Sequence, residues 1–182
     1  MKRNALLHQL VTHENTFDFI VIGGGATGLG IALDAITRGA SVALFEQDDF
    51  TKGTSSRSTK LVHGGVRYLA QGDVSLVLEA LRERGLLRKN ASHLVKNQSF
   101  LIPCYRWWEG AFYTIGLILY DLMAANLGFG RSFCIGPKRA VKTIPMLRKK
   151  GMKAGVIYHD GQFDDSRLAI NIAQTAVDAG AC

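Results

Sequence analysis

Three glycines have the spacing that binding of a dinucleotide requires. Gly23, Gly25 and Gly28 form a G-x-G-x-x-G run. In such a run the first glycine permits a tight turn, the second lets the backbone approach a pyrophosphate, and the third lets a helix pack closely on a strand. The N-terminus of that helix offers N–H donors and a partial positive charge to the anion. The run therefore predicts a site for the pyrophosphate of a dinucleotide.

Glu46 narrows the choice of nucleotide. It follows the glycine run at roughly the 20-residue spacing typical of dinucleotide-binding folds. Its carboxylate can accept hydrogen bonds from the ribose hydroxyls of adenosine, and its charge disfavours a 2′-phosphate. NAD and FAD therefore remain, and NADP is disfavoured. The alternative is a simple glycine turn with an ordinary surface glutamate.

A second segment with potential chemistry runs from Thr54 to Tyr68 (TSSRSTKLVHGGVRY) and combines hydroxyls with glycines. It comes soon after Glu46, where an extended FAD needs to be held along its pyrophosphate and flavin, whereas NAD has no comparable need. The segment therefore favours FAD over NAD. The alternative is a serine-rich surface loop in which Ser58 or Thr59 has a capping role.

The elements around the glycines predict a strand, a helix and a second strand. Phe17–Ile22 is a short apolar run that stops at the glycines, Ala26–Arg38 has helical periodicity and ends at Gly39, and Ser41–Phe45 is a second apolar run. Together they have the size of a βαβ unit, roughly 30 residues. The expected fold class is therefore α/β, with a parallel central sheet.

Further along the chain, Asp49–Arg67 is long for a connection, and such loops are commonly functional. Asp73 can cap a helix that is expected to run to about Asn97, and Ser99–Pro103 is expected to form a strand.

The C-terminal segment predicts one more helix, Asp164–Gly180, in which Asp165 and Arg167 are expected to form an N-cap and a nearby ion pair. After this helix an α/β fold continues with a strand. Ala181 and Cys182 are expected to be the entrance to that strand. We therefore expect residues 1–16 to be a polar leader and residues 17–182 to be the N-terminal part of a cofactor-binding domain from a longer protein.

Composition excludes several classes of protein. The chain has 182 residues, of which 47% are hydrophobic and 20% charged, which excludes disorder and collagen. Its net charge of +7 suits anionic substrates, acidic lipid or nucleic acid. No nucleic-acid partner is expected, because the basic residues are not interleaved with stacking aromatics. The three scattered cysteines predict a reduced, cytoplasmic protein without a metal site.

Two segments bear on membrane contact. Ala111–Phe129 approaches the length of a membrane span, but Asp121 and Asn126 would be costly there, so a buried or interfacial helix is expected. The aromatic group in Tyr105–Phe112 is expected to pack in the core. Lys138–Lys153 contains seven basic residues and no acidic one. It is interpreted as a solvated face, with a membrane-surface or phosphate-attracting patch as the alternative.

Four segments together resemble the FAD-dependent glycerol-3-phosphate dehydrogenases of the bacterial respiratory type. They are residues 23–28, TSSRSTKLVHGGVRYL at 54–69, Tyr120–Leu122 and Phe163–Leu168. The resemblance extends from Phe17 to the end of the chain, and the segment 54–69 is specific to this family and its close relatives. It implies a Rossmann-like FAD-binding fold, incomplete in this chain.

The resemblance also implies roles for individual residues. Arg67 and Tyr68 would face the substrate side of the flavin, with Arg67 anchoring a phosphate. His63 is a candidate base, with a flavin contact or a backbone-bonded histidine as the alternative. The residues expected to bind FAD are Gly23, Gly25, Thr27, Gly28, Glu46, Gln47, Ser55, Ser56, Ser58, Lys60, Leu61, His63, Gly64 and Gly65.

The implied activity is oxidation of sn-glycerol 3-phosphate to dihydroxyacetone phosphate, with electrons passed to quinone or to oxygen. The resemblance implies a role in glycerol metabolism. It also implies a cytoplasmic enzyme with peripheral contact to the inner face of the cell membrane. A homodimer is one option for its oligomeric state. The present chain is expected to be inactive alone, because family members place further basic residues in the C-terminal half. Two rival functions remain, an amine or amino-acid oxidase of the same superfamily and a non-catalytic nucleotide-binding module.

Overall fold

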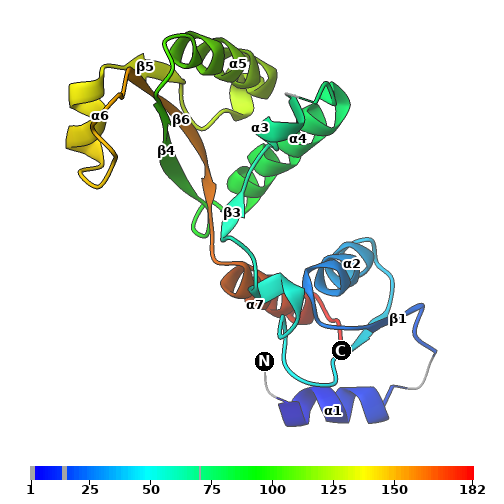
Figure 1. Cartoon of the computed structure of the whole chain (residues 1–182). Coiled ribbons are helices and arrows are strands. Elements are labelled where there is room, and N and C mark those ends of the chain that lie inside the picture. The colour runs from blue at the N-terminus through cyan, green and yellow to red at the C-terminus, as the bar shows by residue number, and fades with distance from the viewer. Residues whose placement is uncertain (1–2, 14–15, 70) are drawn as a thin grey trace. The chain divides into compact units, whose positions relative to one another are not determined.

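The computed structural model describes residues 3–13, 16–69 and 71–182. The chain divides into two compact units, which Figure 1 shows together. The first unit comprises residues 1–60 and 164–182, and the second comprises residues 61–163. Each unit has buried clusters of apolar side chains of its own.

The first unit contains the predicted βαβ arrangement. Strand β1 (Phe19–Ile22) and strand β2 (Val42–Phe45) pair in parallel, and helix α2 (Ala26–Thr37) connects them. The helix ends before Gly39, whose φ of +87° is a conformation that favours glycine. Side chains of α2 and of both strands form one buried cluster, which includes Val21. The prediction of a parallel strand pair is therefore confirmed.

The C-terminal residue lies along the free edge of β2. Its N–H donates to the carbonyl oxygen of Val42 at 2.9 Å, and its carbonyl oxygen accepts from the N–H of Leu44 at 2.7 Å. Phe45, one residue further, instead accepts from Gly23 on the side of β1. Alternate residues of a strand direct their backbone groups to opposite edges. Cys182 therefore occupies the position of a further parallel strand, on the edge of β2 opposite β1.

Two more α-helices belong to the first unit, which also contains the 3₁₀ turn Thr54–Ser56. Helix α7 (Asp165–Asp178) packs against α2, with Leu29 and Ala169 in one buried cluster. Within the predicted leader, residues 3–11 form helix α1 (Arg3–Val11). The side-chain amide of Gln9 donates to the carbonyl oxygen of Gly180 at 3.3 Å, which ties α1 to the segment after α7.

The second unit is built on an antiparallel sheet that sequence analysis did not predict. Strands β4 (Lys96–Cys104) and β6 (Ala154–Gln162) pair along their whole length, and Figure 1 shows them side by side. Strands β3 (Leu61–Val62) and β5 (Phe133–Ile135) each pair with β6 as well. The strand predicted at residues 99–103 is therefore present, but as part of a longer antiparallel strand.

The helices of the second unit lie between its strands in the order of the chain. They are α3 (Val66–Leu69), α4 (Val74–Asn90), α5 (Glu109–Ala124), the 3₁₀ turn Ala125–Leu127, and α6 (Pro137–Thr143). Asp73 caps α4 as predicted, because its carboxylate accepts from the N–H of Leu76 at 3.1 Å. The prediction that α4 runs to Asn97 is wrong. The helix ends at Asn90, and Lys96 already pairs with Gln162 of β6.

Helix α5 buries only one face. The stretch Glu109–Leu127 is long and apolar enough, by length and composition, to cross a membrane, yet Leu117 and Tyr120 of α5 are buried within the unit. Leu122 is 71% exposed and Trp107, just before the helix, is 86% exposed. The burial of Leu117 and Tyr120 agrees with the prediction of a buried or interfacial helix. The prediction that the aromatic group packs in the core is wrong for Trp107, and also for Trp108 and Phe112, which are 40% and 59% exposed.

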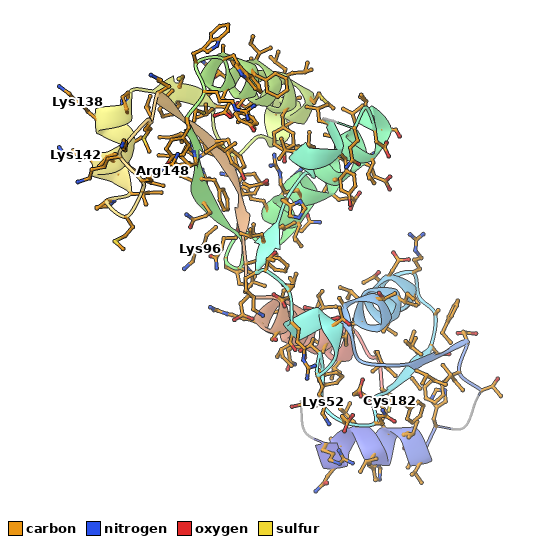
Figure 2. The ribbon with its side chains drawn as sticks, viewed as in Figure 1. Lys52, Lys96, Lys138, Lys142, Arg148 and Cys182 are labelled. Carbon is orange, nitrogen blue, oxygen red and sulfur yellow. The ribbon has the colours of Figure 1, made fainter. Side chains whose placement is uncertain are left out.

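The basic segment forms α6 and the loop after it. Figure 2 shows Lys138 and Lys142 projecting from α6. The guanidinium of Arg148 lies 4.7 Å from the ring centroid of Tyr105, whose hydroxyl donates to the carbonyl oxygen of Arg148 at 3.0 Å. The guanidinium of Arg139 lies 5.9 Å from the ring centroid of Phe133. The two arginines thus contact aromatic rings, while Lys138 and Lys142 are exposed.

Candidate dinucleotide site

The turn between β1 and α2 depends on glycine for its backbone conformation at Gly23 and for space at Gly28. Gly23 adopts a φ of +110° and donates its N–H to the carbonyl oxygen of Phe45 at 2.8 Å. A Cβ atom on Gly28 would lie 2.0 Å from the carbonyl oxygen of Gly23. The helix therefore approaches the strand as closely as the glycine spacing predicts.

Gly24 is a further constrained position, to which sequence analysis assigned no role. A Cβ atom there would lie 2.5 Å from the ring of Phe50. Its N–H donates to Oε2 of Glu46 at 2.7 Å. The pattern G-x-G-x-x-G leaves this position open, so the motif contained no signal for it.

Glu46 stands at the end of β2 as an ionised carboxylate. Its Oε1 accepts from the N–H of Asp48 at 2.9 Å, while its Oε2 accepts from Gly24. These two backbone hydrogen bonds, first that of Asp48 and then that of Gly24, lower the pKa of Glu46. The acceptor that ribose hydroxyls require is therefore charged and held in place at the edge of the glycine turn.

The serine-rich segment meets the glycine run at the N-terminus of α2. Gly25 precedes the helix and provides no side-chain cap. The Oγ of Ser55 accepts from the N–H of Ala26 at 3.0 Å, and a Cβ atom on Gly25 would lie 3.2 Å from this oxygen. Segments that are far apart in sequence thus converge where an anion is favoured.

A hollow of about 400 Å³ opens at this meeting point. Four of the residues predicted to bind FAD line it, namely Gly25, Glu46, Gln47 and Ser55. The N-terminus of α2, the carboxylate of Glu46 and the hydroxyl of Ser55 are the groups that a pyrophosphate and a ribose require. The residues present in the first unit therefore fit the adenosine diphosphate part of FAD.

Two basic residues in the wall of this hollow were missed. Lys52 and Arg57 both line it, and the Nζ of Lys52, labelled in Figure 2, lies 2.6 Å from Oδ1 of Asp48. Cations beside a pyrophosphate oppose its negative charge. The sequence contained a signal for both, because they belong to the loop between Glu46 and Ser58. The prediction for this loop rested on its hydroxyls and glycines alone.

Ser58 and Lys60 bind Asp165 of α7. The Oγ of Ser58 donates to Oδ1 of Asp165 at 2.9 Å, and the Nζ of Lys60 donates to Oδ2 at 2.9 Å. The prediction that an aspartate caps this helix is confirmed, but the N-cap is Asp164 and not Asp165. The predicted ion pair of Asp165 with Arg167 is wrong, because its partner is Lys60. Burial raises the pKa of Asp165, but the hydrogen bonds from Lys60 and Ser58 outweigh this and lower it overall. The two residues anchor the serine-rich segment to α7.

Two other residues of the first unit that are predicted to bind FAD, Thr27 and Ser56, lie outside this hollow. Thr27 lies in the first turn of α2 and is exposed, and the Oγ of Ser56 donates weakly to the carbonyl oxygen of Gly53 at 3.4 Å. The carbonyl oxygen of Ser56 also accepts from Lys60 at 2.9 Å. Thr27 belongs to the glycine run and Ser56 to the serine-rich segment, but neither lines the hollow of about 400 Å³.

The later candidates belong to the second unit. Leu61 starts β3, and the exposed His63 accepts on Nδ1 from the N–H of Gly65 at 3.1 Å. Gly64 is buried and donates its N–H to the hydroxyl of Tyr120 at 2.8 Å. The bond to Gly65 makes His63 the backbone-bonded histidine that stood as the alternative to a base.

Arg67 and Tyr68 lie in α3. The ring of Tyr68 is 45% exposed. The side chain of Arg67 lies outside the part of the chain that the structure describes, so its predicted contact with phosphate stays a prediction.

Comparison with curated proteins finds similar chains among glycerol-3-phosphate dehydrogenases. The mitochondrial glycerol-3-phosphate dehydrogenase of Homo sapiens is 47% identical over 95% of this chain and 25% of its own length. That of Saccharomyces cerevisiae is 45% identical over 100% of this chain and 29% of its own length. The chain therefore spans about a quarter of the curated relatives that it matches.

Comparison with solved structures agrees. The glycerol-3-phosphate dehydrogenase from Bacillus halodurans, solved in complex with FAD, is 34% identical and has a TM-score of 0.69, with 99% of this chain and 28% of that chain covered. The glycine oxidase from Geobacillus kaustophilus, 24% identical with a TM-score of 0.66, shares the fold over 91% of this chain and 45% of its own. The predicted Rossmann-like α/β fold is thereby confirmed. A family pattern described as FAD-dependent oxidoreductase matches residues 18–182, and so the chain belongs to the FAD-dependent oxidoreductase family.

Proposed function

We propose that this chain forms the FAD-binding part of a glycerol-3-phosphate dehydrogenase. The observation that carries the proposal is the hollow where Gly25, Glu46 and Ser55 meet at the N-terminus of α2. Its groups suit the adenosine diphosphate part of FAD, in a chain that is 47% identical to enzymes of this name.

The residues of the first unit bind and orient the cofactor in this proposal. Glu46 accepts hydrogen bonds from the ribose, and the amides at the start of α2 bind the pyrophosphate. Lys52 and Arg57 oppose the charge of the pyrophosphate from the wall of the same hollow. Thr27, Gln47 and Ser56 are further residues of the first unit that are predicted to bind FAD.

The proposed reaction converts sn-glycerol 3-phosphate into dihydroxyacetone phosphate. FAD, when bound, accepts the hydride from the secondary alcohol, and the hydroxyl proton passes to a base. Arg67 holds the substrate phosphate, and Tyr68 lies beside it. We assign His63 to a flavin contact rather than to the base, because its Nδ1 already accepts from Gly65. The two electrons then pass to a quinone or to oxygen.

The test is to produce the protein in its natural full length and to record its absorbance spectrum and its substrates. We expect a flavin spectrum that bleaches on addition of sn-glycerol 3-phosphate, with dihydroxyacetone phosphate as product. Bleaching by an amine or an amino acid instead would support the oxidase alternative. Absence of any flavin from the purified protein would contradict the proposal.

The proposal extends to a cytoplasmic location at the inner face of the cell membrane. It is supported by the exposed lysines of α6 and by the exposed apolar residues of α5, among them Leu122. Basic side chains are attracted to anionic lipid. We expect the protein to sediment with vesicles that contain phosphatidylserine and to lose this binding when Lys138 and Lys142 are replaced by Gln. Equal binding to vesicles of phosphatidylcholine alone would contradict an electrostatic contact.

A further inference from the structure

Three polar side chains meet in the interior of the second unit. Arg84 comes from α4, Tyr120 from α5 and Asp160 from β6 (Figure 1), and they expose only 2%, 1% and 3% of their surfaces. The Nη1 of Arg84 donates to Oδ1 of Asp160 at 2.6 Å. The guanidinium of Arg84 also lies 4.7 Å from the ring centroid of Phe129. A buried ion pair therefore lies among aromatic rings at the junction of three elements.

The hydroxyl of Tyr120 connects this ion pair to Gly64. It donates to Oδ2 of Asp160 at 3.2 Å, and it accepts from the N–H of Gly64 at 2.8 Å. It also accepts from Nη1 of Arg84 at 3.3 Å. A hydroxyl has one donor and two acceptor positions. All three are used, so the orientation of this hydroxyl is fixed.

The contact with Gly64 is close as well as polar. A Cβ atom on Gly64 would lie 2.5 Å from the hydroxyl oxygen of Tyr120 and 2.4 Å from Leu81. The glycine is therefore required for its backbone to reach the hydroxyl. Gly65, the next residue, has a φ of +70° and donates to His63. The turn that is predicted to contact the flavin is thus attached to the buried network at Gly64.

Electrostatics agrees with a positioning role. Burial, followed by the charge of Asp160, raises the pKa of Tyr120, so that the phenol keeps the proton it donates to that carboxylate. A buried ion pair is weak evidence for stability, because desolvation offsets its attraction, but its geometry is strict. In the part of the chain that the structure describes, the Nε of Arg84 has no hydrogen-bond partner. Stability alone therefore gives little reason for this arrangement.

We propose that Tyr120 is a positioning residue that fixes the turn His63–Gly65 through the amide of Gly64, and that Arg84 and Asp160 act by holding its hydroxyl. This inference rests on the proposed function, in which the turn contacts the flavin. Tyr120 does not itself touch the cofactor in this account. It acts through the backbone of Gly64.

The first test replaces Tyr120 by Phe in the full-length protein loaded with FAD. The change keeps the ring and removes only the hydroxyl, with its bonds to Gly64, Arg84 and Asp160. Because the Gly64 amide loses its acceptor, we expect the dissociation constant of FAD to rise about tenfold or more. We also expect the visible circular dichroism and the midpoint potential of the bound flavin to shift.

The matched control is Val77→Ala. Val77 belongs to the same buried cluster as Tyr120 but has no polar group to offer Gly64. We expect this variant to lower the melting temperature while it leaves the flavin spectrum and the midpoint potential unchanged. Equal effects of Tyr120→Phe and Val77→Ala on the flavin would show that Tyr120 contributes only to stability, and would overturn the proposal.

A second measurement does not depend on the cofactor. Hydrogen exchange of the Gly64 amide should be faster in Tyr120→Phe than in the unchanged protein, with or without FAD, because the amide has lost its acceptor. Unchanged exchange at Gly64 would overturn the positioning role even if the protein binds FAD. A protein without flavin that still shows faster exchange would instead overturn the proposed function and leave the positioning of the turn supported.

The double replacement Arg84→Met with Asp160→Leu separates folding from positioning. Apolar residues can replace a buried ion pair without loss of stability. We expect a folded protein in which the Tyr120 hydroxyl has lost the two side chains that orient it, and in which the flavin signals shift in the same direction as in Tyr120→Phe. A folded double variant with unchanged flavin signals would contradict the role given to Arg84 and Asp160.

Discussion

The glycines around the start of α2 differ in what a side chain would disturb. At Gly28 the obstacle is backbone, since a Cβ atom would lie 2.0 Å from the carbonyl oxygen of Gly23. At Gly25 the neighbour is the hydroxyl of Ser55 at 3.2 Å, which leaves the fold intact but narrows the hollow. Substitution at Gly28 therefore tests folding, while substitution at Gly25 tests binding.

We predict that Gly25→Val in the full-length protein loses FAD. The added side chain occupies the approach to the N-terminus of α2, where the pyrophosphate is expected. Gly30→Val is the matched control, because Gly30 lies on the same helix and a Cβ atom there meets nothing within 4 Å. Flavin absorbance per mole of protein measures the result. Full flavin content in Gly25→Val would contradict the assignment of the hollow to the pyrophosphate.

A second prediction at the residue scale concerns Arg67. If its side chain holds the substrate phosphate, Arg67→Ala should weaken turnover of sn-glycerol 3-phosphate far more than FAD retention. Loss of a hydrogen bond to a charged group costs about 1.5–3 kcal/mol, which is roughly a tenfold to hundredfold decrease in kcat/KM. Arg38→Ala serves as the control, since Arg38 forms an exposed ion pair with Asp34. Steady-state kinetics indistinguishable from those of the control would exclude this role.

At the scale of elements, the serine-rich segment is bound to α7 by polar contacts. Asp165 begins α7 and accepts from both Ser58 and Lys60 at 2.9 Å. Lys60 adopts a φ of +61°, which is uncommon for a residue with a side chain. The segment that contributes Ser55 to the hollow is therefore fixed by a contact with the last helix of the chain.

We predict that Asp165→Asn lowers the free energy of unfolding by about 1 kcal/mol near neutral pH, because the partly exposed ion pair with Lys60 is lost. The folded-state pKa of Asp165 lies below its ordinary value of 3.8. Its stabilisation is therefore present above that value and is lost as the pH falls through the lower folded-state pKa. Denaturant unfolding of both proteins from pH 7 down to pH 3 should show the difference shrinking. A difference that grows on acidification would contradict this assignment.

At the scale of the whole molecule, both units expose large apolar side chains. Ile22 of β1 is 88% exposed and Ile20 is 65% exposed, and α5 exposes Leu122 in the second unit. The curated relatives are about four times as long. These surfaces are where further parts of a longer protein, a second copy or a membrane would bind.

We predict that residues 1–182, produced alone, bind FAD weakly or not at all, do not oxidise sn-glycerol 3-phosphate, and associate through their exposed apolar surface. The physical reason is that the contacts found in the first unit serve the adenosine diphosphate part of FAD only. The checks are substrate-dependent dye reduction after addition of FAD and the mass in solution. Robust turnover by a monomer would show that the active site is complete within these residues.

The sequence by itself determined the parts of this protein that depend on neighbouring residues. The order β1–α2–β2, the cap at Asp73 and the choice of FAD followed from short-range spacing, because turns, caps and glycine requirements are local properties. The end of α4 was misplaced for the same reason. Its helical pattern continues past Asn90, and pairing with β6 extends the strand predicted at residues 99–103 back to Lys96.

Only the tertiary structure decided the contacts between residues far apart in sequence. Lys60 and Asp165 are 105 positions apart, and Arg84 and Asp160 are 76 apart. Nothing in the neighbouring sequence distinguishes Asp160 and Asp165, which are buried, from carboxylates that lie on the surface. Their partners follow from the register of β6 and from the packing of α7, which form only when the whole chain buries its apolar side chains together. The sequence thus supplied the prediction of which residues bind the cofactor, and the packing of distant elements decided what holds those residues in place.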